Sequence, residues 1–369
     1  MSQIDKQFWI YYTLLVLMDL KIERFLFKHS SLIKLFLISL LIPSLVFFLK
    51  ALTYDYYPDF SVYYASKIFL EGVNPYFLTS QPVHFVYSPS VILLLLSFSL
   101  LPLFLAQKLF VIFSMFCFFT SVFILFKLFR VSFFSHLGIF FLILLLNYFP
   151  EKFTLGMGQL NNVMLLGTVL FLFFYQRKKD HISGLFLAIP IVIKFFPILL
   201  IIYLIFKRRI NILLSLSAGF ILITLISFIV VGATENFYFY QKVMPNLLGG
   251  FKNDYYNQAI SGFLARQINN PTAVDNIKNI SAALLTILTM LIVWKKRKNK
   301  KLELISIGTL ITLSLIINAY SWQHHFVFLL IPFFITFFHI KNNNLNPKYY
   351  LILAISYALV ALNLEEPFS

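Results

Sequence analysis

The sequence predicts an all-α integral membrane protein, a multi-span helical bundle of about 10–12 membrane helices in which some helices are broken or re-entrant. Two observations predict this fold class. The 369 residues are 60% hydrophobic and only 12% charged, whereas about 25% of the residues of a soluble domain are charged. Apolar stretches also recur along the chain, with short basic runs beside them. No soluble fold of this length could bury so many Leu, Ile and Phe side chains, and lipid removes that requirement.

The apolar stretches mark the expected membrane helices. They cover residues 32–52, 88–105, 107–126, 133–149, 160–176, 182–206, 210–232, 281–294, 302–319, 326–338 and 349–364. Several are shorter than the ~20 residues of an ideal span, so we expect some helices to be tilted, extended by polar residues or incomplete. A single transmembrane domain is expected over residues 32–364, with outer loops at 53–87 and 233–280. Residues 1–31 then form a cytoplasmic or interfacial N-terminal segment, and residues 365–369 form a C-terminal tail.

The net charge of +16 would suit a nucleic-acid-binding protein, but the placement of the basic residues does not. They form short runs beside apolar stretches, at 177–179, 207–209 and 295–298. Cytoplasmic loops of membrane proteins have this pattern, so we expect no nucleic-acid partner. Five basic residues among the first 34 predict a cytoplasmic N-terminus. The single cysteine, Cys117, excludes an intrachain disulfide and a Cys-based metal site.

The stretch 182–206 interrupts a simple alternation of sides. Basic runs bound it at both ends, yet one span would put those ends on opposite sides of the membrane. Pro190, Lys194 and Pro197 lie near its middle. We therefore expect a broken, re-entrant helix pair with Lys194 at its tip, because irregular backbone at membrane depth is tolerated where it lines a cavity. An intramembrane cation of this kind binds an anionic ligand such as phosphate, pairs with a protein carboxylate, or extends to the interface.

Polar residues gather on the expected outer face. The first outer loop places Asp55 and Asp59 among tyrosines that include Tyr63. A carboxylate here suits a general base acting on a sugar hydroxyl. The bland alternative is that the acids are solvated loop charges and the tyrosines are interfacial anchors. Gln159 and Asn161 lie at the outer end of a span, where they either bond helix to helix or line a polar pocket.

Two further outer segments carry candidate ligand-binding groups. The segment 233–280 contains Gln258 and Arg266, and the guanidinium fork of Arg266 suits an anionic headgroup. His324 and His325 open an apolar stretch. Adjacent helical side chains point about 100° apart, so the pair would not readily chelate a metal. Hydrogen bonding to a phosphate or a sugar, or proton transfer, fits the pair better.

The order of these polar blocks resembles that of glycosyltransferase family 87, the DUF2029-type, polyprenol-phosphate-mannose-dependent mannosyltransferases of the GT-C class. The matching blocks are Asp59-Phe60-x-Val62-Tyr63-Tyr64-Ala65 with Gly72-x-Asn74-Pro75-Tyr76, Tyr87-Ser88-Pro89, Gly158-Gln159-x-Asn161, Lys194-x-x-Pro197, Asn257-Gln258-x-x-x-Gly262-x-x-x-Arg266 and Ser321-Trp322-x-His324-His325. One block departs from the family pattern, since two prolines commonly follow the tyrosine that corresponds to Tyr87.

The resemblance implies a GT-C-like bundle and a catalytic role for the transmembrane domain. Enzymes of this family move a hexose, expected here to be mannose, from a polyprenyl-phosphate carrier to a lipid-linked or cell-envelope glycan acceptor. The transfer takes place on the extracytoplasmic face of the cell membrane, with inversion and without a tightly bound metal or cofactor. By resemblance, Asp59 is the general base. The residues expected to contact the donor phosphate or sugar are Lys194, Arg266, His324, His325, Gln159, Asn161, Gln258, Tyr63 and Tyr87.

A lipid or solute transporter or flippase without transferase activity is the competing interpretation. Broken helices and an intramembrane lysine are features of transporters as well. Many such transporters consist of two related halves with polar groups near the midplane, whereas this sequence has no evident internal repeat and concentrates its polar blocks on one face. These differences favour the enzyme.

Overall fold

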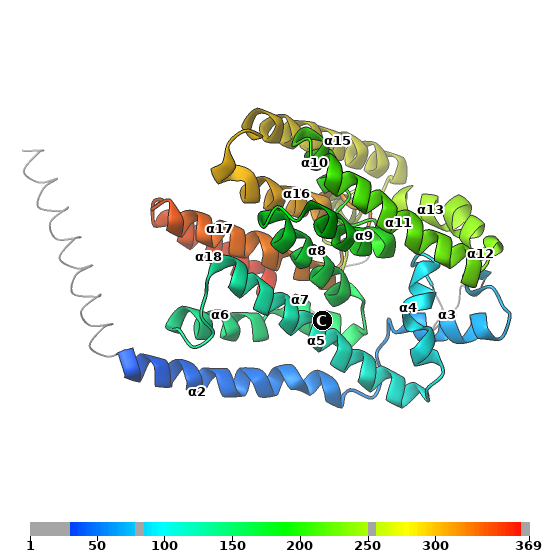
Figure 1. The fold of residues 1–369 in the computed structure, drawn as a ribbon, viewed down its shortest axis with the longest axis horizontal. Helices are drawn as coiled ribbons and strands as arrows, with labels where there is room; N and C mark the ends of the chain where they lie inside the picture. Colours follow the sequence, from blue (N-terminus) through cyan, green and yellow to red (C-terminus); the bar gives the residue numbers. More distant parts are fainter. Residues whose placement is uncertain (1–29, 78–84, 250–255, 363–369) are drawn as a thin grey trace, which may run out of the picture. The chain divides into compact units, whose positions relative to one another are not determined.

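The computed structural model describes residues 30–77, 85–249 and 256–362, and its helices are drawn in Figure 1. Within those residues the regular structure is helical, apart from an isolated antiparallel bridge between Asn257 and Trp322. The predicted all-α fold class is therefore confirmed. The C-terminal tail and nearly all of the N-terminal segment 1–31 lie outside the described residues.

The chain divides into two compact units. The helices of the first unit are α2 (Ser30–Leu49), which belongs to it up to Phe48, and α6 (His136–Leu146). α6 begins where the Ser135 hydroxyl accepts a hydrogen bond from the Gly138 N–H at 3.0 Å, a normal N-cap. The Asn147 amide donates to the Ser44 hydroxyl at 2.7 Å, and His136 Nε2 lies 2.8 Å from the Ser30 carbonyl oxygen, so polar contacts link the two helices near both ends.

The second unit holds the other described elements. In chain order they are η1 (Lys50–Thr53), α3 (Ser61–Leu70), η2 (Pro75–Phe77), α4 (Ser90–Ser99), α5 (Leu103–Phe129), α7 (Phe149–Met157), α8 (Asn161–Gln176), α9 (Asp180–Lys194), α10 (Leu199–Phe206), α11 (Ile210–Val230), α12 (Ala233–Tyr238), the π-helical turn η3 (Phe239–Val243), α13 (Met244–Gly249), α14 (Ile260–Gln267), α15 (Pro271–Lys296), η4 (Lys300–Leu302), α16 (Glu303–Ile317), η5 (Gln323–Leu329), α17 (Leu330–Asn342) and α18 (Lys348–Ala361).

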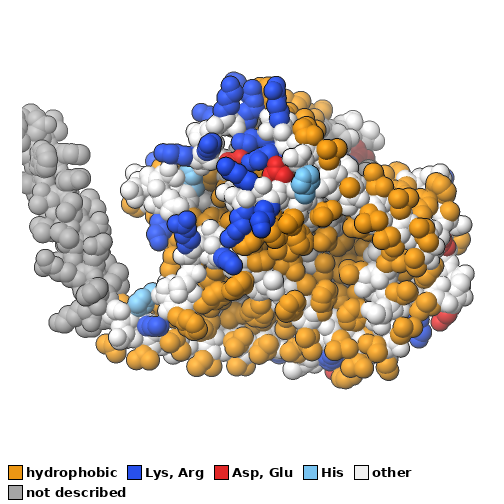
Figure 2. All heavy atoms as spheres, in the orientation of Figure 1, with side chains coloured by type: hydrophobic (Ala, Val, Ile, Leu, Met, Phe, Trp, Pro, Cys, Tyr) orange, Lys and Arg blue, Asp and Glu red, His pale blue; other side chains and the backbone are white. Residues whose placement is uncertain are grey.

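Five of the described helical segments are long and apolar enough to cross a membrane individually. They are Ser30–Thr53, α5, α11, α15 and Gln323–Asn342. Large apolar side chains stand exposed on them, such as Phe116 at 65% and Ile229 at 81%, and Figure 2 shows hydrophobic side chains over much of one face. Lipid is the solvent in which such a surface is stable. The protein is therefore a multi-pass membrane protein, whereas the predicted total of about 10–12 membrane helices stays a prediction.

The centre of the second unit is the packing of α8, α9 and α11, which lie side by side (Figure 1). Small residues allow the close approach. A Cβ atom on Gly184 of α9 would collide with the Ile212 carbonyl oxygen of α11. A Cβ atom on Gly167 of α8 would come within 3.0 Å of the Pro190 ring on α9. Glycine at such contacts is typical of helix packing inside membranes.

The expected break near Lys194 is confirmed. α9 ends at Lys194, Phe195 adopts a left-handed conformation with φ 54°, and α10 begins only at Leu199. Pro197 has no N–H to donate and cannot continue the α9 ladder of hydrogen bonds. The polar side chain of Lys194 is thereby placed at a helix end.

Other boundaries differ from the apolar stretches. The apolar stretches 88–105 and 107–126 divide at residue 106, whereas the helices α4 and α5 divide at residues 100–102, and α5 then runs unbroken to Phe129. α15 begins at Pro271 rather than 281, because the Asn270 side chain caps the helix by accepting from the Ala273 N–H at 3.2 Å. The expected outer loop 53–87 is partly helical, since it contains α3.

Candidate active site

Four segments that lie far apart in the sequence bring polar side chains together. Asp59 precedes α3, Gln159 lies in the turn between α7 and α8, Lys194 ends α9 and His325 lies in η5. The Gln159 amide nitrogen donates to Asp59 Oδ2 at 2.6 Å, and its oxygen lies 3.2 Å from Lys194 Nζ. Lys194 Nζ also lies 3.1 Å from His325 Nε2. One amide group therefore separates a carboxylate from a lysine–histidine pair.

A tight backbone contact fixes Asp59 beside the α7–α8 turn. The Asp59 N–H donates to the Met157 carbonyl at 2.8 Å. The next residue, Gly158, has φ +74°, and a Cβ atom there would lie 3.1 Å from Tyr57 Cβ and 3.2 Å from Phe60 Cβ. Glycine is the residue that meets both demands without strain. The Gly-Gln sequence at 158–159 thus places the Gln159 side chain against the Asp59 loop.

Tyr87 closes one side of the cluster. Its hydroxyl donates to Gln159 Oε1 at 2.5 Å, and Lys194 Nζ lies 4.8 Å from its ring centroid. The Tyr87 carbonyl accepts from the Tyr76 hydroxyl at 2.7 Å, and the Ser88 hydroxyl donates to the Val192 carbonyl on α9 at 2.7 Å. Through these contacts, the residues around Tyr76 and Tyr87 position the Tyr87 ring beside Lys194.

The hydrogen bonds of His325 determine where its proton lies. The Trp322 N–H donates to His325 Nδ1 at 3.1 Å. A neutral imidazole that accepts at Nδ1 carries its proton on Nε2. His325 Nε2–H and the Lys194 ammonium are then both donors, and they face each other across 3.1 Å. An acceptor shared between them, such as a phosphate oxygen, would satisfy both groups.

His324 is placed differently from His325. Its side chain is 2% exposed and packs against the rings of Phe153 and Trp322. Its carbonyl oxygen accepts from the Thr154 hydroxyl at 2.9 Å and from the Asn161 amide at 3.1 Å. Asn161 and Thr154 therefore fix the start of η5 against α7 and α8, and this contact orients the neighbouring His325.

Three other residues predicted to bind the donor lie outside this chain of contacts. The Tyr63 hydroxyl donates to the Leu101 carbonyl at 2.8 Å. The Gln258 N–H donates to the Ser321 carbonyl at 2.8 Å, and Arg266 Nη1 donates to the Asn257 carbonyl at 2.8 Å. The bonds at Gln258 and Arg266 join the segment around Asn257 to the turn that leads into η5. Their predicted contacts with the donor stay predictions.

Burial raises the pKa of Asp59 above its usual value, while the hydrogen bond from Gln159 and the charge of Lys194 act in the opposite direction. Asp59 lies in the loop after the first candidate span. A carboxylate with a raised pKa holds a proton more readily, which suits a group that accepts one during a reaction.

Sequence reasoning missed two polar groups that support the cluster. Lys108 of α5 donates to the carbonyls of Leu52 and Tyr54 and so holds the beginning of the Asp59 loop. Glu151 of α7 is fully buried and accepts from the Asn162 amide at 2.9 Å. A charge next to or inside an apolar stretch is the signal that could have singled out both, because such charges are expensive without partners.

Comparison with protein families decides the class. A family model described as glycosyltransferase family 87 matches residues 85–317, more than half of the chain. The chain belongs to glycosyltransferase family 87. It is accordingly a membrane glycosyltransferase, with a sugar donor and an acceptor as substrates. No curated protein and no solved structure matches the chain.

The family 87 match includes Tyr87, Gln159 and Lys194, whereas Asp59 and the histidine pair lie on either side of it. In the part of the chain that the structure describes, no group of three or more His, Cys, Asp or Glu side chains is arranged to hold a metal ion. The polar groups of the cluster are the Asp59 carboxylate, the Gln159 amide, the Lys194 amine, the His325 imidazole and the Tyr87 hydroxyl.

Proposed function

We propose that this family 87 enzyme transfers a hexose, taken here to be mannose, from a polyprenyl-phosphate carrier to a hydroxyl group of a lipid-linked or cell-envelope glycan. Asp59 acts as the general base. The observation that carries the proposal is the relay in which Gln159 contacts both Asp59 Oδ2 and Lys194 Nζ. Through Gln159, a proton acceptor for the incoming hydroxyl lies beside a cationic site for the donor phosphate. Transfer from a glycosyl phosphate requires both groups.

The cationic side of the cluster takes the donor phosphate. Lys194 contributes a compact positive charge, and His325 contributes an Nε2–H donor whose tautomer the Trp322 N–H maintains. Donors aimed at the charge that develops in the transition state are a large term in catalysis. His324 and Asn161 act by holding the turn that carries His325. Arg266, Gln258 and Tyr63 are proposed to contact the donor once it is bound.

The transfer is a single displacement with inversion. The acceptor oxygen attacks the anomeric carbon, and the bond from that carbon to the phosphate oxygen breaks. The proton of the acceptor hydroxyl passes to Asp59, and polyprenyl phosphate leaves with the bonding electrons. Lys194 and His325 stabilise the negative charge on the departing phosphate. Because phosphate is a good leaving group, the step needs no protonation of the leaving oxygen.

The proposed site opens on the extracytoplasmic face of the plasma membrane, with the N-terminus in the cytoplasm. The basic runs at 177–179, 207–209 and 295–298 support this orientation through the positive-inside rule. The lipid tail of the carrier enters sideways between helices. The acceptor approaches Asp59 from the outer side.

The test is sugar transfer by the purified full-length protein, with a panel of polyprenyl-phosphate sugars and extracted lipid acceptors. We expect Asp59→Asn to lower turnover by about 10²–10⁴-fold, the usual contribution of a general base, while donor binding is retained. Asp55→Asn is the matched control, because Asp55 is an exposed acid in the same loop. It should leave turnover unchanged.

Full turnover by Asp59→Asn would remove Asp59 from the reaction. A large loss in Asp55→Asn with activity kept in Asp59→Asn would assign the base to the other carboxylate. If no polyprenyl-phosphate sugar gives a product while another activated sugar does, the carrier class is wrong although the chain is still a glycosyltransferase.

A further inference from the structure

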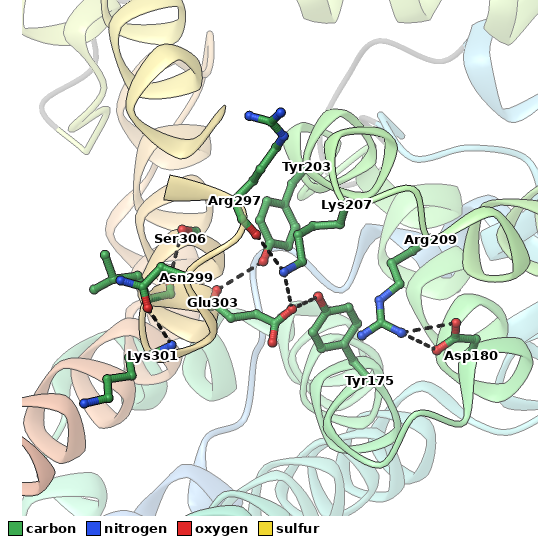
Figure 3. A network of polar contacts seen from close by, with 11 residues as sticks. Tyr175, Asp180, Tyr203, Lys207, Arg209, Arg297, Asn299, Lys301, Glu303 and Ser306 are labelled. Carbon is green, nitrogen blue, oxygen red and sulfur yellow. Dashed lines mark hydrogen bonds and ion pairs between the residues drawn. The ribbon is translucent and has the colours of Figure 1, made fainter. Parts of the chain in front are cut away.

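A second polar cluster lies at the opposite ends of α8, α9 and α16 from the candidate active site. Here the C-terminus of α8 and the N-termini of α9 and α16 meet the residues between α10 and α11 (Figure 3). Each of these three helices has 15 or 16 residues, and a rise of 1.5 Å per residue makes them about 22–24 Å long. The two clusters are therefore separated by most of the thickness of a membrane core.

The two acids of this second cluster already have basic partners. Glu303 accepts from Lys207 Nζ at 2.8 Å and from the Tyr175 hydroxyl at 2.7 Å. Asp180 lies 3.4 Å from Arg209 Nη1, and the Arg209 guanidinium lies 5.0 Å from the centroid of the Tyr175 ring. Lys207 also donates to the Arg297 carbonyl at 3.0 Å. Lys207 and Arg209 are thus held in fixed positions.

A surface hollow of about 430 Å³ lies over this network. It is lined by Asp180, Lys207, Arg208, Arg209, Ile210 and Asn211. Arg208 is exposed, and among the described residues no hydrogen bond or ion pair engages its side chain. Three basic residues and one acid line the hollow, and a second acid, Glu303, pairs with Lys207 from below. The hollow therefore keeps an excess positive charge, and Figure 2 shows Lys and Arg gathered in this region.

An apolar surface continues from the hollow along α11. Ile210 at the rim is 55% exposed, and Leu214, one turn further along the helix, is 61% exposed. α11 is one of the candidate membrane spans. Hydrocarbon chains that lie along this helix would thus begin beside a cationic hollow. This combination matches a lipid with a phosphate headgroup, whereas free phosphate would use the hollow alone.

We propose that the hollow formed by Lys207, Arg208 and Arg209 binds the phosphate headgroup of an anionic membrane lipid, whose acyl chains lie along Ile210 and Leu214. The planar guanidinium of Arg208 binds two phosphate oxygens at once. The fixed side chains of Lys207 and Arg209 add charge with little further loss of side-chain freedom. This site is independent of the proposed transferase chemistry.

The test is lipid binding to the full-length protein in detergent, followed by native mass spectrometry during titration with phosphatidylglycerol or phosphatidylcholine. A basic residue at a membrane surface strengthens anionic lipid binding by about fivefold. We expect Arg208→Gln to weaken the first phosphatidylglycerol site by at least that factor. Arg130→Gln is the matched control, since Arg130 is also an exposed arginine at a helix end, with φ 57° against 53° for Arg208.

Two further variants separate a lipid from free phosphate and test the guanidinium fork. Leu214→Asn should weaken phosphatidylglycerol but leave the affinity for inorganic phosphate unchanged. Arg208→Lys keeps the charge and removes the fork, so its affinity should lie between those of the wild type and Arg208→Gln, and it serves if Arg208→Gln does not purify as a monodisperse protein.

Three outcomes would overturn the proposal. The first is an equal loss in Arg130→Gln and Arg208→Gln, which would mean that the basic surface acts only through its total charge. The second is phosphatidylcholine binding as tightly as phosphatidylglycerol. The third is binding of inorganic phosphate that depends on Arg208 while phosphatidylglycerol is not retained.

Discussion

The two polar clusters at the ends of α8, α9 and α16 match their charges in different ways. At the basic end, Lys207 meets Glu303 at 2.8 Å. At the other end, the contacts of Lys194 are with neutral groups, the Gln159 amide oxygen, the His325 ring and the Tyr87 ring. A charge inside a membrane protein is stable when it has a partner. In the cluster around Glu303 the lysine is thus matched by a protein carboxylate, whereas Lys194 has neutral contacts, and we propose that the donor phosphate supplies its anion.

Replacing the lysine of each cluster by methionine should give the largest difference between the two clusters. Lys194→Met removes the cation that we assign to the donor phosphate. A hydrogen bond to a charged group contributes about 1.5–3 kcal/mol, so donor affinity should fall by about 10–100-fold. Donor binding to purified protein, measured with a polyprenyl-phosphate sugar, checks this value.

Lys207→Met is the control, because it removes a lysine from the cluster in which the lysine is paired with Glu303. It should lower stability and leave donor affinity unchanged. Equal donor affinities for Lys194→Met and the wild type would remove Lys194 from the donor site.

The pH dependence of transfer sharpens the role of Asp59. Its pKa is raised, chiefly by burial, and a base works only when deprotonated. We expect kcat/KM to fall about tenfold per unit as pH drops below that pKa, with the fall beginning at a higher pH than for an exposed aspartate. Lys194 lowers the pKa of Asp59, so Lys194→Met should move the fall to still higher pH. An unmoved profile would show that the two groups do not interact.

The raised pKa of Asp59 also affects folding stability. The direction of this effect with pH is opposite to that of a carboxylate whose pKa is lowered by an ion pair. Since the folded state binds the Asp59 proton more tightly than the unfolded state does, folding stability falls as pH rises from the usual aspartate pKa through the raised one. Asp59→Asn should therefore not destabilise the protein at neutral pH. A marked loss of stability in this variant would contradict the direction of the pKa shift.

The smallest expected effect is on the unfolding free energy, from a substitution in the cluster around Glu303 and Lys207. Glu303→Gln removes the charge that pairs with Lys207, whose side chain is 14% exposed against 17% for Glu303. Partly exposed pairs contribute less than buried ones, so we expect a loss of about 1–2 kcal/mol in unfolding free energy. Unfolding in a denaturing detergent series measures it. Donor binding should not change, and a weakened donor site would contradict the separation of the two clusters.

Most of the fold class could be predicted from the sequence because hydropathy acts locally. The apolar stretches at 160–176 and 210–232 correspond closely to α8 and α11. Pro197, after Lys194, also predicted the end of α9, whereas Pro190 lies inside that helix and does not break it. The start of α15 was missed, since its first turns are polar, although Asn270 followed by Pro271 is a recognisable cap and first-turn pair.

The candidate site could be predicted only in part. Asp59, Gln159, Tyr87, Lys194 and His325 were all singled out from the sequence, and the structure brings them together. Tyr63 and Asn161 were expected at the same site. Their side chains bond to the carbonyls of Leu101 and His324, and their contacts with the donor stay predictions. The sequence alone does not distinguish a polar side chain that binds a ligand near the membrane surface from one that binds a neighbouring loop.

The sequence by itself determined that the chain is helical, lies in a membrane and carries its polar blocks in a particular order, because hydrophobicity, proline and charge act within one stretch of chain. Tertiary structure alone decided that Gln159 joins Asp59 to Lys194, and that Lys207 and Arg209 of one basic run are matched by Glu303 and Asp180. Those contacts depend on how closely α8, α9 and α11 approach through their glycines. The distance between packed helices is a property of both surfaces together, and no single stretch of sequence contains it.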